Sequence, residues 1–343
     1  MTTTVPTSLR PEIDAAMLLL TKLGVTPEDL QAGVAANRPV VPTFAEFVPR
    51  VVAATTKGSL KAYGTYWNKV LQQWGDRRLD EPTPLEIEEL GEHIRNHRVE
   101  RRNGRDGRSA VENYVAAMRC LYHRAVANGY LTEADNPAQK VAKPRRLPST
   151  RRALPDNRLA ELNQAAASSG NDPALDSLLL RLHAETACRR GGALRLRPID
   201  LDPDQCLIRL REKGGTERWQ PVSPTLMRHL LDHARQRHAP WTGQLLRYRN
   251  GQAISYRRYD HLWVRLGKHL PWVATQGISA HWLRHTILTW VERNFGYAVA
   301  RAYAGHNDSS GDPGSTATYV RADIQEVASA LAALTGEPHP RAL

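Results

Sequence analysis

The sequence has few cysteines and no long apolar segment. Its three cysteines are an odd number, and their spacings match no metal-binding motif. This argues against a disulfide framework and favours a reducing compartment. No apolar run approaches the roughly 20 residues needed to cross a membrane. The first residues also lack the basic-then-apolar pattern of a secretory leader. We therefore expect a cytoplasmic protein with no membrane partner.

Lysine is scarce beside arginine. The chain has eight lysines and 39 arginines, and its 35 acidic residues leave a net charge of +12 and a pI near 9.9. Such a charge predicts a polyanionic partner, and nucleic acid is the usual one. An arginine excess is also typical of a GC-rich genome, so the positions of the arginines have to decide.

A length of 343 residues with 41% hydrophobic content predicts about two domains, each with its own core. The composition divides the chain into an N-terminal extension (1–41), a helical domain (42–132), a basic linker (133–153) and a second domain with a C-terminal helix (154–343). Within the extension, Ile13–Leu23 has the spacing of one helix, and a second short helix is predicted at 27–35. No function is assigned to the extension.

The helical domain has clear helix boundaries. Thr83 to Glu86 and Ser109 to Glu112 have the pattern of capping boxes. One predicted apolar stripe consists of Tyr63, Trp67, Val70, Leu71 and Trp74. Between helices, residues 95–108 are rich in arginine and glycine, which favours a loop that contacts phosphates over an ordinary solvated face. Arg105 and Arg108 are the predicted contacts in this loop.

The linker combines proline, polar residues and positive charge, as expected at a domain boundary. Its arginines predict that it lies along a DNA backbone. Four arginines around the turn at Asn250-Gly251 are further candidates: Arg247, Arg249, Arg257 and Arg258. The predicted contacts outside the helical domain are Arg145, Arg146, Arg151, Arg152, Arg257 and Arg258.

The second domain is predicted to be mainly helical with a small β-hairpin or sheet. Residues 206–222 alternate around a Gly-Gly turn, which is typical of a hairpin. Helices are predicted over 173–186, 224–238, 256–269 and 320–334. The pattern leaves open whether the last helix packs in cis or on a neighbouring subunit.

Residues 279–319 contain the main group of candidate functional side chains. His281, Arg284 and His285 have helical spacing behind a predicted N-cap at Ser279, a combination that forms an anion site. The zinc-protease pattern needs Glu directly after the first His, and Trp282 stands there, so we expect no metal. Gly305-His306 and Thr316-Ala-Thr-Tyr319 follow.

This ordered set resembles the tyrosine recombinase (phage integrase) family. The family's signature is His-x-x-Arg-His, then Gly-His, then a nucleophilic Tyr, with about nine residues between the last two. Here His306 and Tyr319 are 13 residues apart, and a polar loop holds the extra residues. The resemblance implies a helical core-binding domain that clamps DNA, followed by a mixed α/β catalytic domain.

A second box supports the resemblance. Thr186-Ala-Cys-Arg189-Arg190-Gly-Gly192 is similar to the family's Thr-Gly-Leu-Arg-x-Gly-Glu, which places the catalytic arginine at Arg189, with Arg190 as the competing candidate. Gly192 stands where the family has an acidic residue that would orient the arginine, and the sequence shows no replacement. The family also carries a catalytic lysine on the hairpin, which Lys213 matches.

The resemblance implies the catalytic residues Arg189, Lys213, His281, Arg284, His306 and Tyr319. The implied reaction cuts and rejoins double-stranded DNA through a 3′-phosphotyrosyl intermediate, without metal, cofactor or ATP, on a homotetramer. It would serve integration, excision or transposition of a mobile element; accessory DNA-bending proteins are not identified. Two alternatives share the fold or the chemistry: a DNA-binding regulator with a degenerate site, and a type IB topoisomerase.

Overall fold

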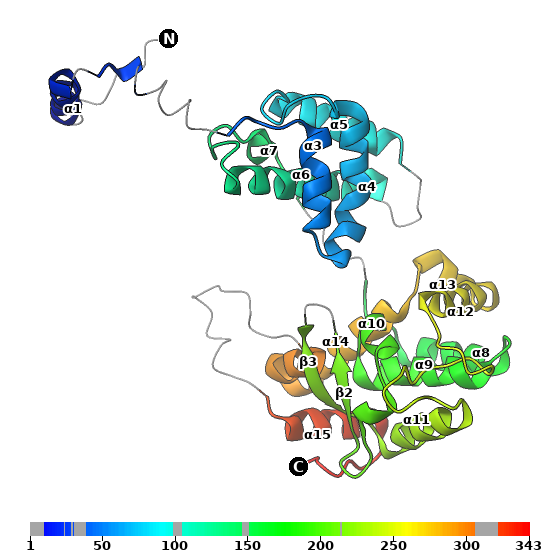
Figure 1. Cartoon of the computed structure of the whole chain (residues 1–343). Helices are drawn as coiled ribbons and strands as arrows, with labels where there is room; N and C mark the ends of the chain where they lie inside the picture. Colours follow the sequence, from blue (N-terminus) through cyan, green and yellow to red (C-terminus); the bar gives the residue numbers. More distant parts are fainter. Residues whose placement is uncertain are drawn as a thin grey trace. The chain divides into compact units, whose positions relative to one another are not determined.

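The computed structural model divides into two compact units, Met1–Pro148 and Ser149–Leu343. It describes residues 10–23, 25–28, 30, 39–98, 105–145, 151–212, 215–305 and 322–343. Figure 1 colours the first unit from blue to green and the second from green to red. The predicted first helix is present as α1 (Arg10–Leu23), whereas most of the predicted 27–35 helix lies outside the described residues.

The core of the first unit is helical. Its helices after α1 are α3 (Phe44–Ala53), α4 (Lys57–Trp74), α5 (Pro84–Asn96), α6 (Arg108–Ala127) and the short α7 (Pro137–Lys140). Trp67 and Tyr122 are fully buried, yet Trp67 donates a hydrogen bond to the carbonyl of Ala117 and Tyr122 donates one to the carbonyl of Leu79. The polar ends of these large side chains are therefore satisfied inside the core.

One of the two predicted capping boxes is present. Thr83 and Glu86 cap α5 reciprocally, as predicted. The box at Ser109 is wrong, because the N-cap of α6 is Gly107, two residues earlier, and Ser109 already lies inside the helix. Gly107 has φ +75°, and an added Cβ would lie 2.7 Å from Cδ of Arg98. A left-handed glycine in close contact with a side chain therefore starts this helix, in place of a hydroxyl cap.

The second unit packs helices around a small sheet. Its helices are α8 (Asp156–Ser168), α9 (Pro173–Thr186), α10 (Arg190–Leu194), α11 (Pro224–Gln236), α12 (Tyr256–His269), α13 (Pro271–Gln276), α14 (Ala280–Ala304) and α15 (Ile324–Thr335). The antiparallel strands β1 (Leu201–Asp202), β2 (Leu207–Arg211) and β3 (Glu217–Pro221) pair in that order. β2 and β3 form the predicted hairpin, with Ile208 opposite Gln220.

The C-terminal helix packs in cis. Val327 and Leu331 of α15 join Ile287, Val291 and Tyr303 of α14 in one buried cluster. After α15, Glu337 accepts a 2.6 Å hydrogen bond from Arg181 of α9. In this chain the C-terminal helix therefore packs on the chain's own second unit.

The architecture agrees with the predicted class, which was mainly α with a small β-sheet. Among the described residues, no helix combines the length and the apolar character needed to span a membrane. In the same part of the chain, no group of three or more His, Cys, Asp or Glu side chains is arranged to hold a metal ion.

Candidate active site

A tight turn after α9 sets the position of Arg189. Ala187 caps α9 in the left-handed region at φ +47°, a conformation that costs energy for a residue with a Cβ. His183 Nδ1 lies 3.0 Å from the carbonyl oxygen of Cys188, and its Nε2 lies 2.9 Å from the hydroxyl of Tyr259 in α12. The turn is thus held from inside the core, and Arg189 leaves it as the N-cap of α10.

Arg189 is paired with a buried carboxylate. Glu212 accepts a 2.6 Å hydrogen bond from the main-chain N–H of Arg189 and a 2.8 Å bond from its Nη1. The side chain of Glu212 is 0% exposed, whereas that of Arg189 is 37% exposed. The carboxylate therefore fixes both ends of the arginine from the interior and leaves part of its guanidinium accessible.

Arg218, which the sequence motifs did not indicate, joins Arg189 and Glu212 in what we call the arginine group. Arg218 of β3 donates to the same Glu212 oxygen at 2.9 Å, and also to the carbonyls of Thr186 and Ala304 at 3.3 Å. Its side chain is only 10% exposed. Arg218 therefore links the hairpin to the ends of α9 and α14.

Arg284 reaches this group because α14 folds back on itself. Its Nη2 donates a 2.8 Å hydrogen bond to the carbonyl of Ala304, 20 residues further along the same helix. A straight helix of that length would span about 30 Å. The helix breaks at Gly296, where φ is 83° and ψ is 171°. The break brings Gly305, the residue before His306, next to Arg284 and Arg218.

The predicted anion site at the start of α14 needs a correction. Ser279 is the N-cap residue, but its side chain makes no capping hydrogen bond. Arg284 is 4% exposed and donates to the carbonyls of Ala187 and Ala304, so it belongs to the interior arginine group and not to an open helix N-terminus. His281 is exposed and His285 is half-buried, so the three side chains have different surroundings.

The charges of this group stabilise one another. Burial alone would raise the pKa of Glu212, but the charge of Arg218, the N–H of Arg189 and the charge of Arg284 outweigh it, and the pKa is lowered. Burial, followed by the charge of Arg189, lowers the pKa of Arg284 to about 10, so it stays cationic at neutral pH. Arg189 and Arg218 bind the one carboxylate, and the charge of Arg284 also acts on it, so three guanidinium groups face a single negative charge and the group is net positive.

His281 lies next to this positive charge. Loss of hydration, followed by the charges of Arg151, Arg284 and Arg189, lowers the pKa of its imidazole. The ring is therefore mostly neutral at pH 7, the form that accepts a proton.

The two candidates for the catalytic arginine differ in their surroundings. Arg190 pairs with the exposed Asp260 at 3.3 Å and lies over the ring of Tyr256, 5.0 Å from its centroid. Arg189 contacts Glu212 and, through it, Arg218. This geometry places Arg189, and not Arg190, beside Arg218 and Glu212.

Three of the predicted catalytic residues, Lys213, His306 and Tyr319, lie outside the described residues. Their roles stay predictions. Glu212 and Gly305, which directly precede the first two in the sequence, both belong to the arginine group. Gly305 has φ +63°, and an added Cβ would collide with the guanidinium of Arg218, so a side chain there would be strained and would displace Arg218.

The predicted DNA-contacting arginines fall into three sets. Those whose side chains are exposed are Arg108, Arg145, Arg151, Arg152 and Arg257. Arg146 and the side chain of Arg105 lie outside the described residues. The prediction for Arg258 is wrong: it is 4% exposed, and its guanidinium binds Asp176 at 2.6 Å and Asn171 at 2.8 Å. A buried and fully paired guanidinium supports the fold and is not available to a backbone phosphate.

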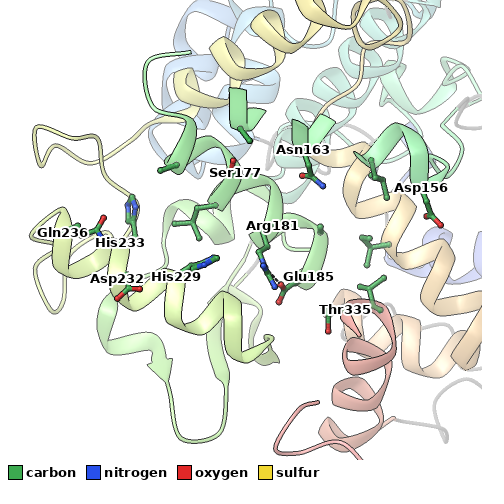
Figure 2. Close-up of a pocket in the computed structure, with 17 residues that line it drawn as sticks. Asp156, Asn163, Ser177, Arg181, Glu185, His229, Asp232, His233, Gln236 and Thr335 are labelled. Atoms are coloured by element: carbon green, nitrogen blue, oxygen red, sulfur yellow. Dashed lines mark hydrogen bonds and ion pairs between the residues drawn. The ribbon is translucent and has the colours of Figure 1, made fainter. Parts of the chain in front are cut away.

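A separate hollow of about 780 Å³ lies between α8, α9, α11 and α15. Figure 2 shows Arg181 and Glu185 of α9 on its wall, together with His229 and His233 of α11. The carboxylate of Glu185 is already bound by Arg181 and by Ser223. Of the predicted catalytic residues that the structure describes, Arg189, His281 and Arg284, none lines this hollow.

Comparison with known sequences places the second unit in a defined group. The model of the phage integrase family matches residues 152–326. A tyrosine recombinase XerC from Chromobacterium violaceum is 28% identical over 239 residues, covering 66% of this chain and 73% of the relative. A XerC from Xanthomonas axonopodis pv. citri is 27% identical over 279 residues, covering 79% and 85%.

Solved structures share the fold at low sequence identity. A lambda integrase dimer bound to a COC′ core site aligns with a TM-score of 0.60 at 15% identity, covering 88% of this chain and 85% of that one. A lambda integrase tetramer bound to a Holliday junction aligns with a TM-score of 0.59 at 15% identity, covering 94% and 89%. The Tn1549 transposon integrase, in complex with a circular intermediate DNA, aligns with a TM-score of 0.59 at 13% identity, covering 77% and 91%.

Proposed function

Because the chain belongs to the phage integrase family and is a tyrosine-type recombinase, we propose that it cuts and rejoins DNA through a covalent bond between Tyr319 and a 3′-phosphate. The observation that best supports this is the group formed by Arg189, Arg284 and Arg218 around Glu212. Fixed guanidinium groups stabilise the extra negative charge of a phosphoryl transition state better than water does, because they need no reorganisation.

The proposed reaction runs in two balanced steps. The phenolate oxygen of Tyr319 attacks the scissile phosphorus, and the bond to the 5′-oxygen breaks. A 3′-phosphotyrosine and a free 5′-hydroxyl result. The 5′-hydroxyl of a second strand then attacks the same phosphorus and releases the tyrosine. The covalent bond conserves the energy of the phosphodiester, so the cycle consumes no ATP.

Proton transfers complete each step. A free tyrosine has a pKa near 10, so only about one in a thousand is ionised at pH 7. The neutral imidazole of His281 is suited to accept the phenolic proton. Lys213 would donate a proton to the leaving 5′-oxygen, and His306 would hydrogen-bond a phosphate oxygen. In the rejoining step the transfers run in reverse: Lys213 would take the proton of the attacking 5′-hydroxyl, and His281 would return a proton to the released tyrosine. His285 is assigned to packing and not to the reaction.

The proposed partner is double-stranded DNA, held by the helical first unit and by the second unit together. Exposed arginines in both units support this, among them Arg108, Arg145 and Arg257. Exchange of two strand pairs needs four active sites, so we propose a homotetramer on DNA. The lambda integrase neighbour on a Holliday junction is such a tetramer.

The finer biological role is proposed as integration, excision or transposition of a mobile element. Its support is the likeness to lambda and Tn1549 integrases, whereas the XerC relatives indicate site-specific recombination in general. Mapping the genomic positions at which the trapped protein is linked to DNA tests the role. Positions at the ends of a mobile element support it, and a single chromosomal position shared by strains without the element contradicts it.

The chemical proposal is tested with Tyr319→Phe. The protein is incubated with duplex DNA carrying a nick next to the cleavage position, so that the short released strand diffuses away and the adduct accumulates. We expect the wild type to form a protein–DNA adduct that resists denaturant, and Tyr319→Phe to bind the same duplex without an adduct. An adduct that persists in Tyr319→Phe would falsify the assignment of the nucleophile.

A further inference from the structure

Gly192 and Glu212 occupy one small volume beside Arg189. A Cβ added to Gly192 would lie 3.1 Å from Cγ and 3.2 Å from Oε1 of Glu212, which is tighter than an ordinary contact. Gly192 is also buried, in the first turn of α10, so there is no open space beside it. The carboxylate of Glu212 therefore fills the space next to the position where the family signature has its acidic residue.

We propose that Glu212 is the positioning carboxylate of this active site, and that Gly192 is glycine in order to admit it. The proposal rests on the proposed function, since it requires Arg189 to bind the scissile phosphate. Glu212 touches no reacting atom in this scheme. It acts by holding Arg189 in place.

The contacts of Glu212 suit this role. Its Oε1 fixes the main chain of Arg189 at 2.6 Å, and its Oε2 fixes the guanidinium of the same residue at 2.8 Å. A bond to each end leaves the side chain little freedom to rotate away. Because Oε2 also accepts from Arg218 at 2.9 Å, the carboxylate connects Arg189 with β3.

The position of Glu212 in the chain adds a second consequence. It directly follows β2, its N–H donates a 2.8 Å bond to the carbonyl of Thr216 across the hairpin turn, and it directly precedes Lys213. The same residue therefore ties the turn that carries the predicted general acid to the arginine that binds the phosphate. An acidic residue at position 192, on α10, would hold the arginine without any tie to the hairpin.

This exchange predicts that substitutions at the two positions depend on each other. Gly192→Glu alone brings a second carboxylate against Glu212, where steric overlap and like charge both oppose it. Glu212→Gly alone removes the partner of Arg189. The double variant Gly192→Glu/Glu212→Gly moves the carboxylate to α10 and removes the clash. Gly192→Glu is therefore harmful in the wild-type background and beneficial in Glu212→Gly.

The experiment measures single-turnover cleavage of a nicked duplex that carries the sequence at which the wild-type protein is trapped. We expect Glu212→Gly to lower the cleavage rate about 100-fold, Glu212→Gln to lower it about tenfold, and the double variant to regain at least about tenfold over Glu212→Gly. Glu217→Gln, an exposed carboxylate on the same hairpin, is the matched control and should cleave within about twofold of wild type. DNA affinity and thermal melting are measured for every variant.

A second substrate separates positioning from a general loss of structure. Replacing one non-bridging oxygen of the scissile phosphate by a methyl group makes the linkage neutral, so the charge of the arginine matters less. If Glu212 acts through Arg189, the effect of Glu212→Gly shrinks on this methylphosphonate by about tenfold or more. Equal losses on both linkages overturn the proposal, because they indicate only a damaged fold.

The remaining outcomes distinguish the two levels of inference. Suppose that the wild type cleaves, and that Glu212→Gly and Glu212→Gln both cleave within about twofold of its rate. This result overturns the role of Glu212 and leaves the proposed function standing. Failure of the double variant to improve on Glu212→Gly also overturns it. Failure of the wild type to form any adduct, with adduct formation by a related recombinase in parallel, overturns the proposed function itself.

Discussion

Arg189 and Arg190 are neighbours in the sequence but have different environments. Arg189 is held by a carboxylate with no exposed side-chain surface, whereas Arg190 pairs with Asp260, whose side chain is 63% exposed. A guanidinium oriented by a buried carboxylate can stabilise charge in a transition state, while an exposed ion pair contributes little. The environment of each residue therefore separates two candidates that the local sequence could not.

We expect Arg189→Ala to lower the rate of covalent cleavage at least about 100-fold, by analogy with the loss of one oxyanion donor, which costs about 3 kcal/mol. Arg190→Ala should lower it less than about tenfold, because its partners are exposed. Single-turnover adduct formation on a nicked duplex measures both. The opposite order of effects would assign the catalytic role to Arg190.

His233 gives the second unit a measurable response to acid. It is 7% exposed, its Nε2 accepts the N–H of Arg247 at 3.1 Å, and burial, followed by the charge of Arg237, lowers its pKa to about 4. The unfolded chain would protonate this ring near pH 6.5. As pH falls from 6.5 towards 4, the unfolded state therefore gains protons that the folded state does not, and stability is lost.

The expected loss is about 2 kcal/mol between pH 6.5 and pH 5 for this residue. In His233→Gln this part of the pH dependence should disappear, so its unfolding free energy should change less over the same interval. Urea unfolding at pH 7, 6 and 5 measures it, with the exposed His229→Gln on the same helix as control. Parallel pH curves for wild type and His233→Gln would show that His233 is not responsible.

At the scale of elements, the break in α14 decides which residues meet. Arg284 and the Ala304 carbonyl bond at 2.8 Å only because the helix reverses at Gly296. The combination φ 83° and ψ 171° is accessible almost only to glycine, and no atom lies within 4 Å of an added Cβ. The constraint at Gly296 therefore comes from the backbone and not from packing.

Gly296→Ala should lower the free energy of unfolding by about 1–3 kcal/mol through backbone strain alone. Cleavage should fall as well, because the Ala304–Gly305 end of the helix would move away from Arg284. Gly58→Ala is the control, since its added Cβ also meets no atom but φ is not in the left-handed region; its stability should not decrease. Equal stabilities of the two variants would mean that Gly296 carries no strain.

At the scale of the whole molecule, the net charge of +12 is not a uniform property. Arg95 and Arg98, in the run predicted to contact phosphates, are paired with Asp106 at 2.8 and 3.0 Å. Arg108 and Arg145 of the first unit are exposed, and Nε of Arg108 donates to the carbonyl of Arg145 at 3.2 Å. The arginines available to a polyanion are therefore the exposed ones, and the total charge of the chain does not identify them.

Arg108→Gln and Arg145→Gln should each weaken binding of the full chain to duplex DNA similarly for all sequences. Each should also reduce the slope of log affinity against log salt by about one, because one phosphate contact releases about one counterion. Filter binding or fluorescence anisotropy at several salt concentrations measures the slope. Arg235→Gln, an exposed arginine already paired with Asp232, is the control; an equal change there would indicate a nonspecific charge effect.

Local patterns were sufficient for much of the fold. The helices α9, α11 and α12, the β2–β3 hairpin and the cap at Thr83 depend on residues within a few positions of one another, and their predictions are confirmed. The start of α6 was not predicted, because its N-cap is the left-handed Gly107, which has no side chain to mark it as a cap in the sequence.

The partners within the arginine group could not be predicted from local sequence patterns. The motifs named Arg189 and Arg284, and they marked Gly192 as a missing acid, but they did not supply Glu212, which lies 23 residues beyond Arg189. Burial likewise removed Arg258 from the predicted DNA contacts, although its sequence context is as basic as that of Arg257. The order and type of the chemical groups are properties of the chain and were readable from it. Which charges face each other inside a low-dielectric core depends on long-range packing, and only the folded arrangement assigns those partners.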